Sequence, residues 1–145
     1  MSGSSVFLAL PTPRVYHGAG VIEQATTGLA FVFVVGGSAG VSPNGWSNRT
    51  TMFDHAKFQW TRKADLLVPR QYPAVGVAGN VLFVVGGNND AGVLSSAEKY
   101  DLQTAAWRLA SAITPTTAAG TGVVPRAGAA PLLFAVGGLA VFQDC

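Results

Sequence analysis

Three short apolar runs along the chain each end in a pair of glycines. The runs are residues 29–35, 81–85 and 132–136, and the pairs that follow them are Gly36–Gly37, Gly86–Gly87 and Gly137–Gly138. The first glycines of these pairs lie 50 and 51 residues apart. Nearly continuous Val, Leu and Phe over so few residues predicts strands that are buried on both faces. A fixed period of about 50 residues predicts a repeat architecture.

A second feature recurs after the first two glycine pairs. An aromatic residue followed by Asp precedes a tryptophan by seven residues, first at Phe53 and Trp60 and again at Tyr100 and Trp107. These two copies lie 47 residues apart, so the difference from the glycine spacing falls in the loop after the glycines. We expect the aromatic side chains to pack between neighbouring sheets.

Each copy is predicted to form a four-stranded antiparallel sheet. A strand of small residues follows Pro13–Arg14 in the first copy and Pro69–Arg70 in the second, and the apolar run, the aromatic strand and the tryptophan strand come next. The predicted fold class is therefore all-β, with one unit over residues 1–145. Its three sheets are expected at about 14–63, 70–110 and 116–145, and the third copy reaches Cys145 without an aromatic-Asp pair or a tryptophan.

The apolar run with Gly-Gly, the Tyr-Asp pair and the tryptophan about seven residues later resemble the kelch repeat. This resemblance implies that each copy is a blade of a β-propeller, and that the second copy is the best match. The first copy has Phe53 in place of tyrosine. Propellers contain four to eight blades, so about three kelch-type blades imply an incomplete ring within one chain.

A third blade without its outer strand would expose an unpaired sheet edge. Residues 6–10, Val-Phe-Leu-Ala-Leu, are predicted to supply the missing strand. Two copies of the chain would then form a homodimeric ring of six blades. The alternatives are a fragment that another polypeptide completes and an open arc.

Composition supports an all-β chain and narrows the classes of partner. Apolar residues make up 49% of the chain and charged residues 11%, against about 25% charged in an average domain. The nine Lys and Arg residues give a net charge of +2 without a block of like charge, so nucleic acid is not a predicted partner. No secretory signal or membrane span is recognised, and the single cysteine suits a reducing compartment, which together favour a cytoplasmic location.

No motif in the sequence predicts catalysis, a metal or a cofactor. Residues 36–40 match the G-x-S-x-G pattern of serine hydrolases, but Pro43 and Gly45 do not fit the strand-to-helix turn that this motif requires. His17 and His55 have no Cys or carboxylate at a spacing typical of zinc sites. The sequence therefore favours a noncatalytic module.

The loops are the predicted partner-binding surface, because rigid sheets that present variable loops are a common binding scaffold. In kelch domains partners dock on the loops between the second and third strands and between blades, which implies residues 38–48, 88–95 and 64–70 here. The candidate partner-binding residues are Arg14, Asn44, Trp46, Arg70, Asn88, Asn89 and Asp90. A structural salt bridge is the alternative for each arginine, and packing over a blade is the alternative for Trp46.

These features favour a protein-interaction or scaffolding module with a protein partner. One alternative is an enzyme or carbohydrate-binding propeller whose pocket forms only in the assembled ring. Another is a structural subunit of a larger assembly.

Overall fold

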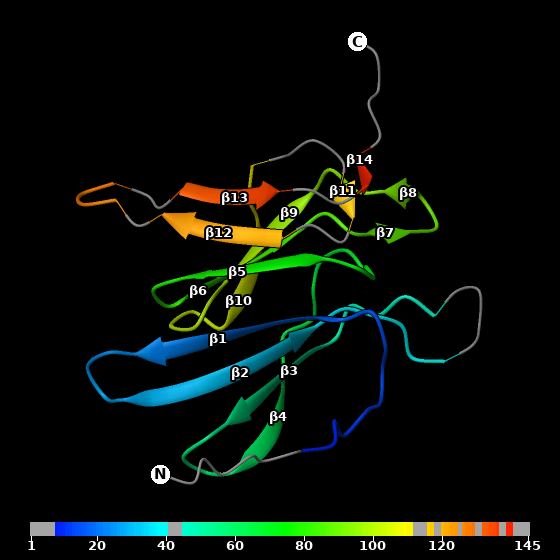
Figure 1. Ribbon diagram of the computed structural model, residues 1–145. Coiled ribbons are helices and arrows are strands. Elements are labelled where there is room, and N and C mark those ends of the chain that lie inside the picture. Colours follow the sequence, from blue (N-terminus) through cyan, green and yellow to red (C-terminus); the bar gives the residue numbers. More distant parts are fainter. Residues whose placement is uncertain are drawn as a thin grey trace, which may run out of the picture.

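The computed structural model describes residues 8–40, 45–111, 116–117, 120–124, 126–129, 132–136 and 139–140. The regular elements within these ranges are β-strands, as Figure 1 shows. No helix among the described residues is long and apolar enough to cross a membrane. The predicted all-β fold is confirmed.

The first sheet contains four antiparallel strands in chain order. They are β1 (Gly18–Gln24), β2 (Leu29–Val35), β3 (Thr50–Asp54) and β4 (Gln59–Lys63). Buried residues dominate the second half of β2 and all of β3, the two inner strands, as expected for strands with neighbours on both sides. Tight turns join β1 to β2 and β3 to β4 at one end of the sheet.

The second sheet repeats this topology with β5 (Ala74–Ala78), β6 (Val81–Val85), β9 (Ala97–Asp101) and β10 (Ala106–Leu109). The loop between β6 and β9 contains a short hairpin, β7 (Asn88–Asn89) with β8 (Gly92–Val93), where the sequence predicted only a loop. The two sheets therefore share one backbone plan and differ in this loop.

The described part of the third copy consists of two strand pairs. Strand β12 (Gly120–Val124) pairs with β13 (Leu132–Val136), and β11 (Thr116–Thr117) pairs with β14 (Leu139–Ala140). Gly137–Gly138 lie outside the described residues. Of the predicted donor strand at 6–10, residues 8–10 are described, and they are not in a strand. The sheets formed by the described strands do not close into a ring.

The sheets stack through their first strands. Strand β5 lies between β1 and β12, one above the other in Figure 1. A Cβ atom on Gly18 would lie only 2.3 Å from Val75, and one on Gly20 only 2.7 Å from Leu82. The hydroxyl of Thr121 donates a hydrogen bond to the carbonyl of Val75. Small residues in the first strand are therefore required for the sheets to approach this closely.

The core lies between the first and second sheets. Tyr100 and Phe33 pack with their ring centroids 5.4 Å apart, and Trp107 lies 5.3 Å from Tyr100. All three side chains are buried, and Leu66 joins them from the segment that connects the sheets. The predicted packing of the second copy's aromatic pair between neighbouring sheets is thus confirmed.

Candidate functional site

The loops between the second and third strands of both sheets lie at the same end of the structure. Val35, at the end of β2, pairs with Thr50, and Val85, at the end of β6, pairs with Ala97. The segments that lead into β1 and β5 arrive at this end too, because Gly18 pairs with Val35 and Ala74 pairs with Val85. We call this end, on the right in Figure 1, the loop face; it comprises residues 14–17, 36–40, 45–49, 70–73 and 86–96.

The double glycines allow each loop to contact the segment that enters the sheet. Gly37 and Gly87 have φ angles of 94° and 90°. A Cβ atom on Gly37 would lie 2.6 Å from the carbonyl oxygen of Val15, and one on Gly87 would lie 2.5 Å from that of Gln71. Beside Gly87, the peptide groups of Gln71 and Asn88 exchange hydrogen bonds of 3.0 and 2.9 Å. Only glycine fits both the angle and the contact.

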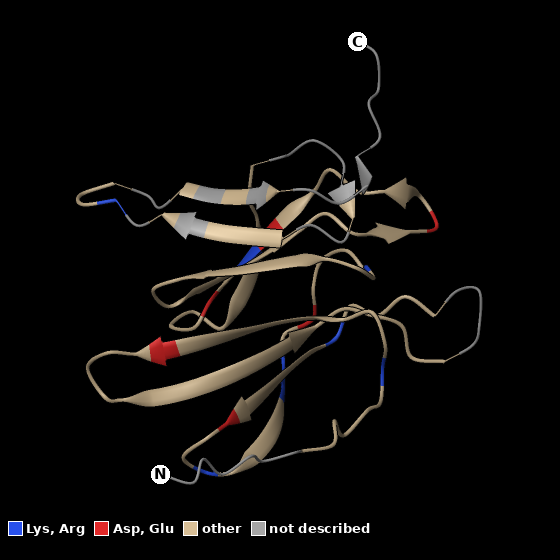
Figure 2. Cartoon of the chain, viewed as in Figure 1, with Lys and Arg blue, Asp and Glu red and all other residues tan. Residues whose placement is uncertain are grey.

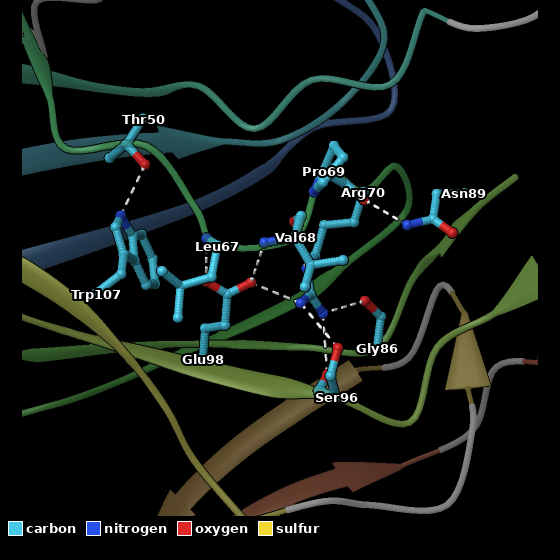
Figure 3. Close-up of polar contacts among 10 residues, drawn as sticks. All are labelled: Thr50, Leu67, Val68, Pro69, Arg70, Gly86, Asn89, Ser96, Glu98 and Trp107. Atoms are coloured by element: carbon cyan, nitrogen blue, oxygen red, sulfur yellow. Dashed lines mark hydrogen bonds and ion pairs between the residues drawn. The ribbon is translucent and has the colours of Figure 1, made fainter. Parts of the chain in front are cut away.

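Arg70 closes the base of the loop in the second sheet. Its Nη1 donates to the carbonyl oxygens of Gly86 at 2.8 Å and Ser96 at 2.9 Å, the two ends of that loop (Figure 3). Its Nη2 donates to the Ser96 hydroxyl at 3.0 Å. One side chain therefore holds both ends of residues 86–96 in place.

Glu98 neutralises this arginine within the same sheet. Its Oε2 lies 2.7 Å from Nη2 of Arg70, and both side chains are 0% exposed. The Glu98 carboxylate also accepts hydrogen bonds from the backbone N–H groups of Leu67 and Val68, at 2.6 and 3.1 Å (Figure 3). Burial lowers the pKa of Arg70, and the Glu98 carboxylate opposes that shift. The salt bridge predicted as the alternative for Arg70 is present.

Arg14 has the same position in the first sheet, but it has no acidic partner among the described residues. It donates to the carbonyl oxygens of Gly36 at 3.2 Å and Arg49 at 2.8 Å, and to the hydroxyl of Thr51. Its side chain is buried, and its pKa is lowered by burial and by the nearby Arg49 and Arg62. The guanidinium groups of Arg14 and Arg70 are both buried and bonded to the ends of the loops, so these arginines position the loops. Their predicted role in partner binding stays a prediction.

The other candidates differ in how accessible they are. Asp90 is exposed at the tip of the β7–β8 hairpin, and Trp46 is half-buried in the loop of the first sheet. Asn89 is used internally, since its amide donates to the Pro69 carbonyl at 2.9 Å. Asn88 has a buried Oδ1 with no donor among the described residues. Asn44 lies outside the described residues.

Two tyrosines that the sequence analysis did not select dominate the exposed part of the loop face. Tyr16 and Tyr72 stack with their ring centroids 4.4 Å apart and are 51% and 36% exposed. Each comes two residues after its clamping arginine, and each has a positive φ, 58° and 52°. The Tyr72 N–H donates to the Tyr16 carbonyl at 2.8 Å. Bulky residues rarely adopt this conformation, and residues held in it are concentrated at functional sites.

Charge does not single out one region of the two sheets. Figure 2 shows the basic and acidic positions dispersed along both of them. The repeated sheets, their stacked first strands and their shared loop face define the structure as a set of β-propeller blades.

Comparisons with known proteins agree with this architecture. The Kelch motif family model matches residues 69–112. Kelch-like protein 41a of Danio rerio is 35% identical over 97 residues, which cover 67% of this chain. Alpha-scruin of Limulus polyphemus is 28% identical over 138 residues, or 90% of the chain, and Kelch-like protein 15 of Mus musculus is 35% identical over 80 residues, or 53%. The chain belongs to the kelch-repeat family, and it spans 13–15% of the length of these relatives.

Proposed function

We propose that this chain is a noncatalytic protein-interaction module that binds its partner through the loop face. The stacked pair Tyr16–Tyr72 is the observation on which this proposal depends. Large aromatic side chains are typical anchors of protein interfaces, because they bury much area at a low cost in side-chain entropy. Val15, 54% exposed, extends the apolar surface beside them.

The loops around this pair are held rigidly, which favours binding. Arg14 and Arg70 fix the ends of the two long loops, and the exchange of backbone hydrogen bonds fixes the entering segments. A surface whose shape is fixed before binding loses less conformational entropy when the partner docks. Trp46, in the loop of the first sheet, and Asp90, in the turn of the β7–β8 hairpin, are further contact positions on this face.

The test is a double substitution, Tyr16→Asn with Tyr72→Asn, in the chain used to capture its native partner. Asn tolerates the left-handed backbone conformation, so the aromatic rings are removed without a change in the fold. We expect partner binding to weaken at least about tenfold, as for the loss of an interface hot spot. Affinity is measured by titration against the partner identified by cross-linking and mass spectrometry.

A substitution at the opposite end of the sheets is the control. Thr26, exposed in the turn between β1 and β2, is changed to Ala. Binding by Thr26→Ala should equal that of the unmodified chain. Unchanged binding by the tyrosine variant, with its circular dichroism preserved, would contradict the proposed loop-face site.

Completion of the ring has two candidate routes. Two copies of this chain would provide six blades, as predicted from the sequence, whereas blades from another polypeptide would complete it in a different way. Light scattering on the purified chain distinguishes them. A dimer supports the two-copy ring, and a stable monomer supports completion by other blades.

A further inference from the structure

The stack of Tyr16 on Tyr72 uses one face of each ring. The two ring planes differ by 29°, and the ring centroids lie 4.4 Å apart. Tyr72 is not part of the apolar clusters that the described residues form in the core, and 36% of its surface is exposed. The exposed part of its ring therefore lies on the edge and on the face turned away from Tyr16. We call that face the outer face of Tyr72.

The third copy has no ring with which to continue this stack. The first strands of the three copies are in the same register, because each has a glycine that pairs with a phenylalanine of the second strand. The residues four positions before these glycines are Tyr16, Tyr72 and Ala118. The outer face of Tyr72 is turned away from the first sheet, on the side of β5 where β12 lies. Alanine at the third position offers this face no aromatic neighbour.

The exposed charge on the loop face is acidic. The guanidinium groups of Arg14 and Arg70 are buried and bonded to the ends of the loops. Arg49 is half-buried and donates to the hydroxyl of Thr12 at 3.0 Å. Asp90 is exposed in the turn of the β7–β8 hairpin. Among the described residues of the loop face, no arginine or lysine is therefore fully exposed for binding an acidic or phosphorylated group.

The Tyr72 ring presents a neutral aromatic surface. Partial burial raises the pKa of Tyr72, and the neighbouring Tyr16 adds to this shift. The hydroxyl is therefore protonated at neutral pH, and a cation beside it would have shifted the pKa the other way. The face of a neutral aromatic ring carries partial negative charge, so it attracts cations and disfavours anions.

A planar cation matches this surface better than an aliphatic side chain does. A guanidinium group is flat and weakly hydrated, stacks on aromatic faces and carries five N–H donors. Gln71, beside Tyr72, and Asp90, on the neighbouring hairpin, carry side-chain oxygens that accept hydrogen bonds. An aliphatic group or a proline ring would cover the ring but would have no donor for these oxygens.

We propose that the partner of the loop face places an arginine side chain on the outer face of Tyr72. The guanidinium plane then lies against the Tyr72 ring with Tyr16 behind it, so that three flat groups form one stack. This inference rests on the proposed function, because it names the chemistry of a residue that docks on the loop face.

The charge requirement is tested on the unmodified chain. N-acetylarginine amide is titrated against N-acetylcitrulline amide, which has nearly the same flat shape without the charge, and NMR follows the ring signals of Tyr72. We expect the arginine compound to bind about three- to fivefold more tightly, as for a cation on an exposed ring. Equal affinities, or tighter binding of N-acetylproline amide, would overturn the proposal.

The position of the site is tested by comparison with another exposed aromatic residue. Phe58 is 57% exposed at the opposite end of the first sheet and has a φ of 54°, close to the 52° of Tyr72. Its ring signals should stay unchanged in the arginine titration. Tyr72→Phe keeps the ring and should keep the response, whereas Tyr72→Asn tolerates the backbone conformation and should lose it. A response that survives Tyr72→Asn, or an equal response at Phe58, would overturn the site.

The native partner separates this inference from the proposed function. A benzoylphenylalanine at Val15, which is 54% exposed beside the stack, identifies the partner segment by photo-crosslinking. Each arginine of that segment is then changed to glutamine. One such change should weaken binding to the unmodified chain at least about threefold and should have no effect on binding to Tyr72→Asn.

The two failures give different results. If the double variant Tyr16→Asn with Tyr72→Asn still binds the partner fully, the proposed loop-face site is wrong, and this inference is wrong with it. If the double variant loses binding but no arginine of the cross-linked segment depends on Tyr72, the loop-face site stands and only the arginine contact is overturned.

Discussion

The two complete sheets have the same backbone plan, but their buried polar side chains have different hydrogen-bond and ion-pair partners. Their strand order, their clamping arginines and their aromatic pairs coincide. The second sheet has a fully buried ion pair and a tryptophan with two acceptors, whereas the described residues of the first sheet contain neither. Features fixed by the backbone thus recur in both complete sheets, and features that depend on a neighbouring sheet differ according to which neighbour is present.

The largest difference in stability between equivalent substitutions is expected at the two arginines. Arg70→Met leaves the buried carboxylate of Glu98 without its counter-ion and should reduce the free energy of unfolding by about 3–5 kcal/mol. Arg14→Met leaves no buried carboxylate and should cost about 1–2 kcal/mol through its lost hydrogen bonds. Urea denaturation of both variants measures the difference. Equal losses would mean that the two arginines are equivalent despite Glu98.

The glycine pairs should instead behave alike in both sheets. Gly37→Ala and Gly87→Ala each place a Cβ against a backbone oxygen at a positive φ, so each should cost about 2–3 kcal/mol. Gly92 also has a positive φ, but its Cβ would meet no atom within 4 Å. Gly92→Ala should therefore cost only about 1 kcal/mol. Thermal unfolding of the three variants checks this, and a Gly37 loss far below the Gly87 loss would contradict a common backbone plan.

Much of the fold could be predicted from sequence because local patterns determine it. The apolar runs, the glycine pairs and the aromatic-Asp dipeptides each fix a strand or a turn near their own position, and they correctly located all eight long strands of the two complete sheets. The β7–β8 hairpin was missed, since Asn88–Asn89 and Gly92–Val93 have no apolar alternation. The donor strand predicted at 6–10 is not seen in its described residues.

The site was harder to predict because its determinants are contacts between distant segments. Glu98 is an ordinary acidic residue in the sequence, and only the fold brings it to Arg70, 28 residues earlier. Alignment of the repeats could have revealed the exchange of Glu98 for Thr51. Tyr16 and Tyr72 could have been found in the same way, since each follows its arginine by two residues. Their stacking across two sheets has no signal in the sequence.

A smaller difference in the free energy of unfolding is expected between substitutions at the two tryptophans. Trp107→Phe keeps most of the buried ring but removes both hydrogen bonds of Nε1, so the hydroxyl of Thr50 loses its donor. We expect a loss of about 1–2 kcal/mol in the free energy of unfolding. Trp60→Phe removes an N–H group that has no acceptor among the described residues, and it should change the stability by less than about 0.5 kcal/mol. A comparable loss in both variants would show that the Trp60 Nε1–H has a hydrogen-bond acceptor in solution.

The smallest effect concerns the aromatic residue that differs between the repeats, Tyr100 against Phe53. The Tyr100 hydroxyl is buried without a partner among the described residues, and burial raises the pKa of Tyr100 above its ordinary value. A raised pKa means that the folded state holds the phenol proton more tightly than the unfolded state does. The resulting stability is therefore complete below the ordinary tyrosine pKa of about 10 and is lost as the pH rises above it.

Tyr100→Phe makes this position of the second sheet resemble the first. At neutral pH it should be neutral or slightly stabilising, because it removes a buried hydroxyl that has no hydrogen bond. Urea midpoints measured from pH 8 to above pH 10 should fall less steeply for Tyr100→Phe than for the unmodified chain. Parallel curves would show that the Tyr100 hydroxyl stays hydrated or hydrogen-bonded, and the two repeats would then differ at this position only in side-chain size.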